Sequence, residues 1–313
     1  MPTLPIELYC QILDYTDQKT CYSLLLTSRF LHDEAERQLY RSIRCPYLAS
    51  TRRCRPRVLN TRPLQVFDRI GSSPRLAGYI EELDVGDFQY DMRYGWPEGE
   101  SLRWTRLVAA YSWMINLKRL ILPRCELDGL NRHVRGEFTF IPKVSESNPP
   151  FQLRSITYLS NIDDPARLDH LMRFLTTQSR ITELRLTFAT ALPDPHILPL
   201  LRTADISWPL CPLVLGQWRI LQLKIHGCSG VSNVAIPKVI PGSGSLRRLW
   251  IVPPILSIAL PALSECFPHL RFLRMTIVGV FCLAPHNRLF TNLRVAIGYL
   301  RTANATMGRV NKT

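Results

Sequence analysis

The chain of 313 residues is long enough for a large hydrophobic core or for an array of small repeats. Hydrophobic residues make up 46% of it and charged residues 20%, which is typical of a folded protein and argues against intrinsic disorder. The 24 prolines outnumber the 15 glycines, so we do not expect long uninterrupted helices.

The net charge of +14 comes from two segments of the chain. Residues 41–63 hold seven arginines, residues 266–313 hold six arginines and Lys312, and neither segment contains an acidic residue. The rest of the chain is therefore electrically balanced. Basic segments attract phosphate or acidic protein surfaces. Two such segments on an otherwise neutral chain, however, provide less basic surface than a nucleic-acid-binding protein usually has.

The nine cysteines show no CxxC pair and no Cys/His spacing typical of a metal site. The start of the chain has no signal peptide, so we expect reduced thiols in a cytoplasmic or nuclear protein. Residues 249–264 are uncharged, but they include three prolines and fall short of the roughly 20 residues that a membrane span needs. The sequence thus predicts no metal, no cofactor and no membrane attachment.

Residues 4–15 are predicted to form a short first helix. Pro5 suits its first turn, where a missing N–H needs no partner. Leu8, Ile12 and Tyr15 fall on one apolar line, because they are spaced at i, i+4 and i+7. A helix this short is not stable alone and requires other surfaces to pack against.

Two further short helices are predicted before residue 41. Residues 17–20 are expected to form a turn, and Leu24 lies in the second helix. Thr27 or Ser28 can cap the third, which ends near Tyr40. Three short helices with more apolar surface than they can bury indicate a docking surface for a partner. The alternative is a helical cap that covers the first repeat of a solenoid.

This N-terminal segment resembles an F-box. The matching positions are Leu4, Pro5, Glu7, Ile12, Leu13, Leu24, Ser28, Arg29, Ala35, Leu39 and Tyr40. The resemblance implies docking on the Skp adaptor, and through it on a cullin–RING ubiquitin ligase. It also implies that the adaptor is faced or framed by Leu4, Pro5, Leu8, Ile12, Leu13, Leu24, Ser28 and Arg29. Residues 17–22 depart from the family pattern, because the usual aspartate–leucine start of helix two is missing.

From residue 80 onward, one pattern recurs: an apolar residue, two others, an apolar residue, one other, and an apolar residue. It begins at Ile80, Leu117, Leu153, Ile181, Ile220, Leu246 and Leu270, and more weakly at Leu293. The later intervals match the length of a leucine-rich repeat, whereas the earlier ones are longer and predict insertions. Helices are expected over residues 102–115 and 165–178, and after Pro195 and Pro254. Residues 132–151 are expected to form a long loop.

The fold class predicted is α/β: a three-helix F-box, then an irregular leucine-rich-repeat solenoid with a parallel sheet on its concave face. A single α/β domain is less consistent with the sequence, because its strands would be continuous apolar runs and these strands alternate. The predicted segments are the F-box (1–44), a basic linker (45–63), the solenoid (64–300) and a disordered tail (301–313).

Alternation places one set of strand residues on the open concave face. Those expected to bind a target are Arg119, Arg185, Lys224, Arg248, Trp250, Phe272 and Arg274. Arginine and aromatic side chains often anchor protein interfaces, and the positive charges favour an acidic target. Alternatively, these charges only keep the strands soluble.

No catalytic motif occurs in the sequence, so we expect a non-catalytic protein. The function predicted is that of a substrate-recognition subunit of an SCF-type ubiquitin ligase, with an unidentified protein as its target. The alternative is a basic solenoid that binds RNA or another anionic surface without any role in ubiquitination. The arginine-rich run 52–57 is either a nuclear localisation signal or a solvated linker.

Overall fold

The computed structural model shows two compact units, Met1–Leu201 and Arg202–Thr313. The residues that the structure describes are 5–27, 29–44, 62–85, 106–107, 109–122, 148–158, 165–186, 193–207, 210–226, 243–252, 267–277 and 294–299. The expected basic run 52–57, the helix after Pro254 and the tail 301–313 lie outside these ranges.

The first unit begins with three helices: α1 (Ile6–Asp14), α2 (Gln18–Leu24) and α3 (Arg29–Arg41). α1 starts directly after Pro5, whose backbone is extended. Residues 17–20 are not a separate turn, because the Thr20 N–H donates to Asp17 Oδ1 at 2.7 Å and Asp17 therefore caps the start of α2. Among the side chains described in these helices, the buried ones are Leu13 in α1, Cys21 in α2 and Ala35 in α3.

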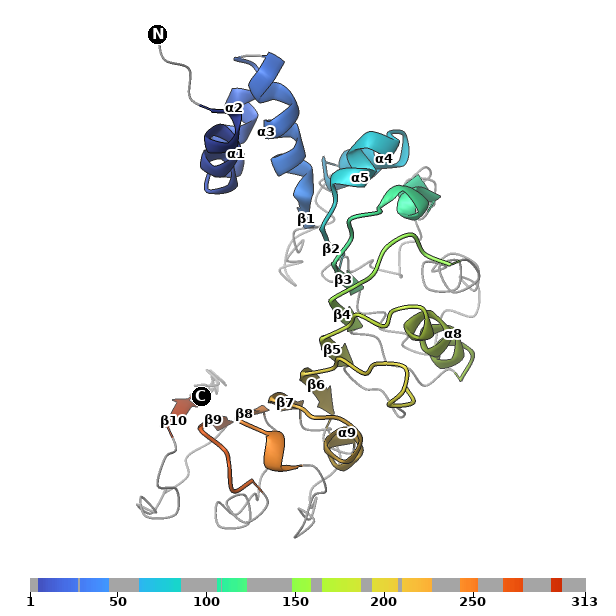
Figure 1. Ribbon diagram of the computed structural model, residues 1–313, viewed down its shortest axis with the longest axis vertical. Coiled ribbons are helices and arrows are strands. Elements are labelled where there is room, and N and C mark those ends of the chain that lie inside the picture. Colours follow the sequence, from blue (N-terminus) through green and yellow to red (C-terminus); the bar gives the residue numbers. More distant parts are fainter. Residues whose placement is uncertain are drawn as a thin grey trace, which may run out of the picture. The chain divides into compact units, whose positions relative to one another are not determined.

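The strands of the first unit are all parallel and are paired in the order of the chain. They are β1 (Ser42–Arg44), β2 (Glu82–Asp84), β3 (Arg119–Leu122), β4 (Ser155–Tyr158) and β5 (Glu183–Leu186). The connections carry α4 (Arg62–Gly71), α5 (Pro74–Tyr79), the 3₁₀ helix η2 (Ala110–Trp113) and α8 (Pro165–Thr176). These helices lie to the same side of the strands (Figure 1), as right-handed crossovers between parallel strands require.

The second unit repeats this arrangement. Its parallel strands are β6 (Thr203–Ser207), β7 (Gln222–His226), β8 (Arg248–Val252), β9 (Phe272–Ile277) and β10 (Arg294–Tyr299). α9 (Cys211–Gln217) lies between β6 and β7, and the 3₁₀ helix η4 (Ser243–Ser245) precedes β8. The predicted α/β fold with a parallel sheet is therefore confirmed in both units.

The register explains why the strands alternate. In the first unit, Leu83, Leu120, Ile156 and Leu184 are direct register partners, and all four are buried. In the second unit, Leu223, Leu249 and Leu273 form the equivalent buried row. In these rows each strand adds a leucine or isoleucine to the core, while the alternate side chains lie on the opposite face of the sheet.

Two strands were not predicted. β1 follows α3 without a break and pairs with β2, so the sheet begins within residues 1–44. β6 lies in the long interval between the patterns at Ile181 and Ile220, where an insertion was expected. Its sequence, TADIS, lacks the usual leucines, because Ala204 and Ile206 fill the buried positions.

The helical predictions had mixed outcomes. α8 confirms the helix expected over residues 165–178. Of the helix expected at 102–115, residues 106–107 and 109 are helical, and η2 continues the segment as far as Trp113. The helix expected after Pro195 is wrong: this segment forms turns, with the Ile197 N–H donating to the Asp194 carbonyl at 2.9 Å. α9 was not expected.

A buried glutamine fixes the loop before β4 to the end of α8. The Leu153 N–H donates to Gln178 Oε1 at 2.8 Å, and Gln178 Nε2 donates to the Phe151 carbonyl at 3.4 Å. Gln178 is fully buried, so it supplies partners that this loop would otherwise take from water. The same loop positions the first residue of β4 in the sheet.

Candidate functional site

Five large apolar side chains of the N-terminal helices are exposed. Their exposed fractions are 41% for Leu8, 56% for Ile12, 93% for Tyr15, 64% for Tyr22 and 81% for Leu26. Leu8, Ile12 and Tyr15 share one face of α1 and its C-cap, as the spacing in the sequence predicted. We call these five residues the N-terminal apolar surface. Exposed large apolar side chains gathered on one element often mark binding sites for proteins.

The helices that carry this surface are held by polar contacts as well as by their core. Arg41 Nη1 lies 3.0 Å from Asp14 Oδ1, which joins the ends of α3 and α1. Arg41 Nε also lies 3.4 Å from Glu81 Oε2, and Lys118 Nζ reaches the same carboxylate at 2.9 Å. Glu81 therefore links α3 to the segments that lead into β2 and β3, and so fixes α3 on the sheet.

The residues expected to meet the Skp adaptor have different environments. Pro5, Leu8, Ile12 and Arg29 are exposed, and Leu24 is half-buried. Leu13 is only 3% exposed, and its helix α1 packs against α3. Its side chain therefore supports the helices and does not present a docking surface. Leu4 and Ser28 lie outside the described residues. Tyr15, Tyr22 and Leu26 were not among the predicted site residues, although their exposure makes them equally available.

The open face of the first sheet carries charges of both signs. Arg119 lies between Glu82 and Glu183 in the register, with Nη1 at 3.8 Å from Glu82 Oε1 and Nη2 at 3.9 Å from Glu183 Oε2. Arg44 also pairs with Glu82, at 3.9 Å. The basic residues on this face are Arg44, Arg119 and Arg185, and the acidic ones are Glu82, Asp84 and Glu183. We call this the charge-balanced face.

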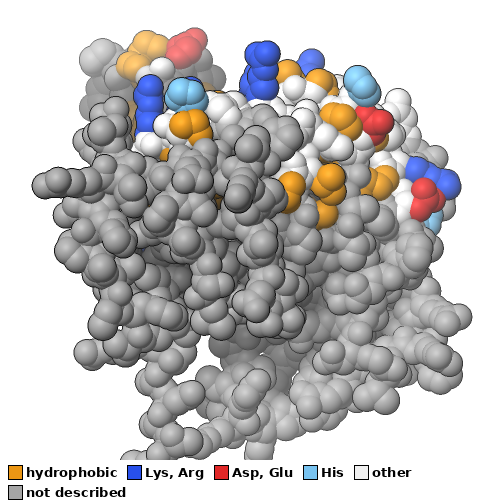
Figure 2. Space-filling view, turned by 90° about the horizontal axis from the view of Figure 1, so that it is seen from below, with side chains coloured by type: hydrophobic (Ala, Val, Ile, Leu, Met, Phe, Trp, Pro, Cys, Tyr) orange, Lys and Arg blue, Asp and Glu red, His pale blue; other side chains and the backbone are white. Residues whose placement is uncertain are grey.

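The open face of the second sheet has a different composition. Arg248 is the register partner of Phe272, and Trp250 is the register partner of Arg274. The two aromatic rings contact each other diagonally, with centroids 5.8 Å apart and planes inclined at 56°. Both arginines are exposed and both aromatic residues are half-buried. We call these four residues the aromatic–arginine face. Figure 2 shows basic, acidic, histidine and hydrophobic side chains intermingled over the described part of one side of the molecule.

Lys224, the remaining predicted target residue, already has partners in the protein. Its Nζ lies 3.3 Å from Asp205 Oδ2, and the other oxygen of Asp205 lies 2.5 Å from His226 Nε2. Asp205 is on β6, the strand that the sequence pattern missed. The predicted target residues therefore separate by unit and by environment: Arg119 and Arg185 lie on the charge-balanced face, Lys224 is neutralised, and the other four residues form the aromatic–arginine face.

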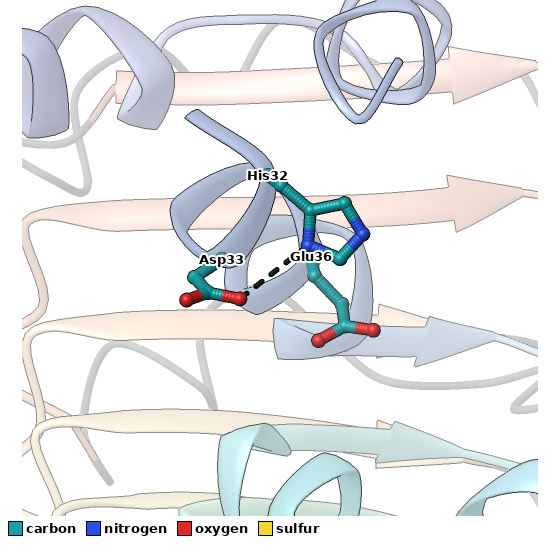
Figure 3. Close-up of side chains that lie close together, drawn as sticks. All are labelled: His32, Asp33 and Glu36. Carbon is teal, nitrogen blue, oxygen red and sulfur yellow. Dashed lines mark hydrogen bonds and ion pairs between the residues drawn. The ribbon is translucent and has the colours of Figure 1, made fainter. Parts of the chain in front are cut away.

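One group of side chains has the composition of a metal site. The ligand atoms of His32, Asp33 and Glu36 lie within 4.8 Å of one another on α3 (Figure 3). Arg75 lies beside them, with its guanidinium 3.4 Å from Asp33 Oδ1 and 2.5 Å from Glu36 Oε2. This arginine supplies the positive charge that a cation would contribute, so we assign no metal to the group. It holds α3 against α5 instead.

Cys21, the cysteine in the core of the N-terminal helices, does not have the environment of a reactive thiol. Burial raises the pKa of the Cys21 thiol, and the nearby Asp17 carboxylate raises it further. The thiol therefore stays protonated at neutral pH, and a protonated thiol is a poor nucleophile. Cys21 serves as an apolar core residue.

No protein-family model matches this sequence, and neither does any curated protein. Among the helices that the structure describes, none combines the length and the apolar character that crossing a bilayer requires.

Proposed function

We propose that this protein is a substrate receptor of an SCF-type ubiquitin ligase, working in the cytoplasm or the nucleus. In this role, α1–α3 act as an F-box that docks on the Skp adaptor, and the sheet presents a face to a target protein. The observation that carries the proposal is the N-terminal apolar surface, because it lies on the helices whose sequence resembles an F-box.

The energetics of this surface support docking on a protein. Burying a leucine, isoleucine or aromatic side chain contributes about 1.5–3 kcal/mol, so several of them together can hold a stable complex. The alternative of a solenoid cap predicts that these side chains cover the first repeat. In the structure Leu13 is buried, whereas Leu8 and Ile12 are 41% and 56% exposed.

The sheet supports the second half of the proposal. Within each unit, strands are paired in chain order and the described connecting helices lie to one side, so none of these helices covers the opposite face. This is the arrangement that a leucine-rich-repeat receptor uses to present side chains to a partner. The receptor needs no catalytic residue of its own, because the other subunits of the ligase supply the chemistry and the receptor supplies proximity.

Co-expression with the Skp adaptor tests the docking role. The full-length chain should co-purify with the adaptor, and the double variant Leu8→Asp/Ile12→Asp should not. Each aspartate replaces an apolar contact with a charge that the complex would have to bury, so two of them should abolish binding. Because Leu8 and Ile12 are 41% and 56% exposed, the variant should remain folded, which circular dichroism would check.

A matched control comes from exposed apolar residues outside the N-terminal helices. Ile115 is 60% exposed after η2, and Leu213 is 50% exposed on α9. The double variant Ile115→Asp/Leu213→Asp should bind the adaptor like the unmodified chain. The proposal fails if the unmodified chain forms no complex with the adaptor, or if both double variants lose binding to the same extent.

A further inference from the structure

We infer that the aromatic–arginine face of the second unit is the surface that binds the target, and that its ligand is an acidic segment of a protein with interspersed apolar side chains. This inference rests on the receptor role proposed above, and it narrows that role to Arg248, Trp250, Phe272 and Arg274. Arg119, Arg185 and Lys224, although predicted to join them, are excluded by the environments that they occupy.

The positive charges of Arg248 and Arg274 are not balanced by acidic residues described on this face. Arg248 and Arg274 make no ion pair within the part of the chain that the structure describes, and both side chains are exposed. Lys224 is satisfied by Asp205, which His226 also contacts. The described face around β8 and β9 thus holds two guanidinium groups without counter-charges. Carboxylates of a partner are their natural complement, because an Arg–carboxylate pair can form two parallel hydrogen bonds.

The aromatic rings of Trp250 and Phe272 lie next to the two arginines in the sheet. Arg248 and Phe272 are register partners, as are Trp250 and Arg274, so arginine and aromatic side chains alternate in both directions across β8 and β9. The tilted contact between Trp250 and Phe272 restrains both rings. Half-buried aromatic side chains beside arginines are the residues that most often dominate a protein interface. A ligand that matches this pattern alternates acidic and apolar side chains.

The number of cations on this face favours a protein ligand over a nucleic acid. Binding to a phosphate backbone depends on several cations along a track, each of which releases counterions. Here the described face offers two uncompensated cations, Arg248 and Arg274, which are few for such a track. A short acidic protein segment needs no more than the two arginines.

The charge-balanced face is a less favourable site for an acidic ligand than the aromatic–arginine face. A ligand that recruited Arg119 would have to displace Glu82 and Glu183, which already lie 3.8 and 3.9 Å from its guanidinium. An intramolecular pair that must be broken lowers the net gain from a new one. The aromatic–arginine face carries no such cost, so an acidic ligand should prefer it.

Selection from a random-peptide display library on the full-length chain tests this inference. Enriched peptides should be rich in aspartate and glutamate, with aromatic or aliphatic residues between them. Their affinity, measured by fluorescence anisotropy, should fall by roughly tenfold or more in Arg248→Glu/Arg274→Glu, because each carboxylate then meets a like charge. Trp250→Ala should weaken binding without altering the preference for acidic peptides.

Arg219→Glu provides the matched control, because Arg219 is exposed in the same unit but lies between α9 and β7, away from this face. Binding by this variant should match that of the unmodified chain. The inference is overturned if no acidic preference emerges, if Arg248→Glu/Arg274→Glu binds as well as Arg219→Glu, or if a single-stranded oligonucleotide binds more tightly than the selected peptides.

The two proposals fail separately. Arg248→Glu/Arg274→Glu should still bind the Skp adaptor, and Leu8→Asp/Ile12→Asp should still bind the selected peptides. If the unmodified chain does not bind the adaptor, the ligase role is contradicted, but the peptide result still stands. If the chain shows no preference for acidic peptides, only the assignment of the aromatic–arginine face is contradicted.

Discussion

The two units of the molecule share a construction but differ on their open faces. In the first, Arg119 stands between Glu82 and Glu183, and positive and negative side chains compensate one another. In the second, Arg248 and Arg274 alternate with Trp250 and Phe272, and neither arginine has an acidic partner among the described residues. On the charge-balanced face, ion pairs within the protein neutralise the charges. On the aromatic–arginine face, the two arginines remain available to a ligand.

This difference arises without any change in the buried rows. Leu120 in β3 and Leu249 in β8 occupy equivalent positions, and both are fully buried between register partners of the same kind. The buried positions of each strand determine that it joins the sheet, and the alternate positions are free to vary. A repeated architecture can therefore hold a structural face in one unit and a binding face in the other.

The largest effects are expected where the units are alike. Leu120→Ala and Leu249→Ala should each lower the free energy of unfolding by about 2–5 kcal/mol, because both remove buried methyl groups and leave a cavity. Urea denaturation followed by circular dichroism measures this. Leu221→Ala is the control, since Leu221 is 40% exposed and should cost far less. A small loss for either buried leucine would show that the two cores are not equivalent.

The repeating strands could be predicted from the sequence because leucine and isoleucine recur at fixed spacing before and within each strand. Every pattern from Ile80 to Leu270 led into a described strand. β6 could not be found in this way, since Ala204 takes the place of a leucine and the strand is recognisable only from its neighbours. β1 was missed because Ile43 alone occupies its buried position.

The candidate sites were predictable in part. Alternation correctly placed Arg248, Trp250, Phe272 and Arg274 on the face opposite the buried leucines. The sequence could not show which cations are neutralised, because ion pairs such as Lys224–Asp205 join separate strands and depend on the register between them. Nor could it show that Leu13, rather than Leu8, faces the core of the N-terminal helices, since both sides of α1 are apolar.

The pH dependence of the free energy of unfolding should show whether the ion pairs of Glu81 stabilise the first unit. Burial pushes the pKa of the Glu81 carboxyl upward, but the hydrogen bond from Lys118 and the charges of Arg41 and Lys118 outweigh it, so the pKa is lowered overall. A lowered pKa in the folded state means that the carboxylate stabilises the fold above its unfolded pKa of about 4.3. This contribution is lost as the pH falls through the lower, folded value.

Glu81→Gln should therefore be less stable than the unmodified chain at neutral pH, and the difference should shrink as the pH falls below about 4. Urea denaturation across pH 3–7, a window on both sides of roughly 4.3, measures this. Glu7→Gln is the matched control, because Glu7 is exposed on α1 and makes no ion pair in the described part of the chain. A constant difference between Glu81→Gln and the unmodified chain at every pH would contradict the assignment.

The smallest effect distinguishes the two faces directly. Arg119→Ala should lower the free energy of unfolding by roughly 0.2–1 kcal/mol, because it leaves Glu82 and Glu183 without their shared partner on an exposed surface. Arg248→Ala should cost less, since it breaks no ion pair. Raising the salt concentration should reduce the cost of Arg119→Ala and leave that of Arg248→Ala unchanged, because salt screens exposed pairs. Urea denaturation at low and high salt compares them. Equal costs with equal salt dependence would mean that Arg248 is also compensated within the protein, and that its face has no charge to offer a ligand.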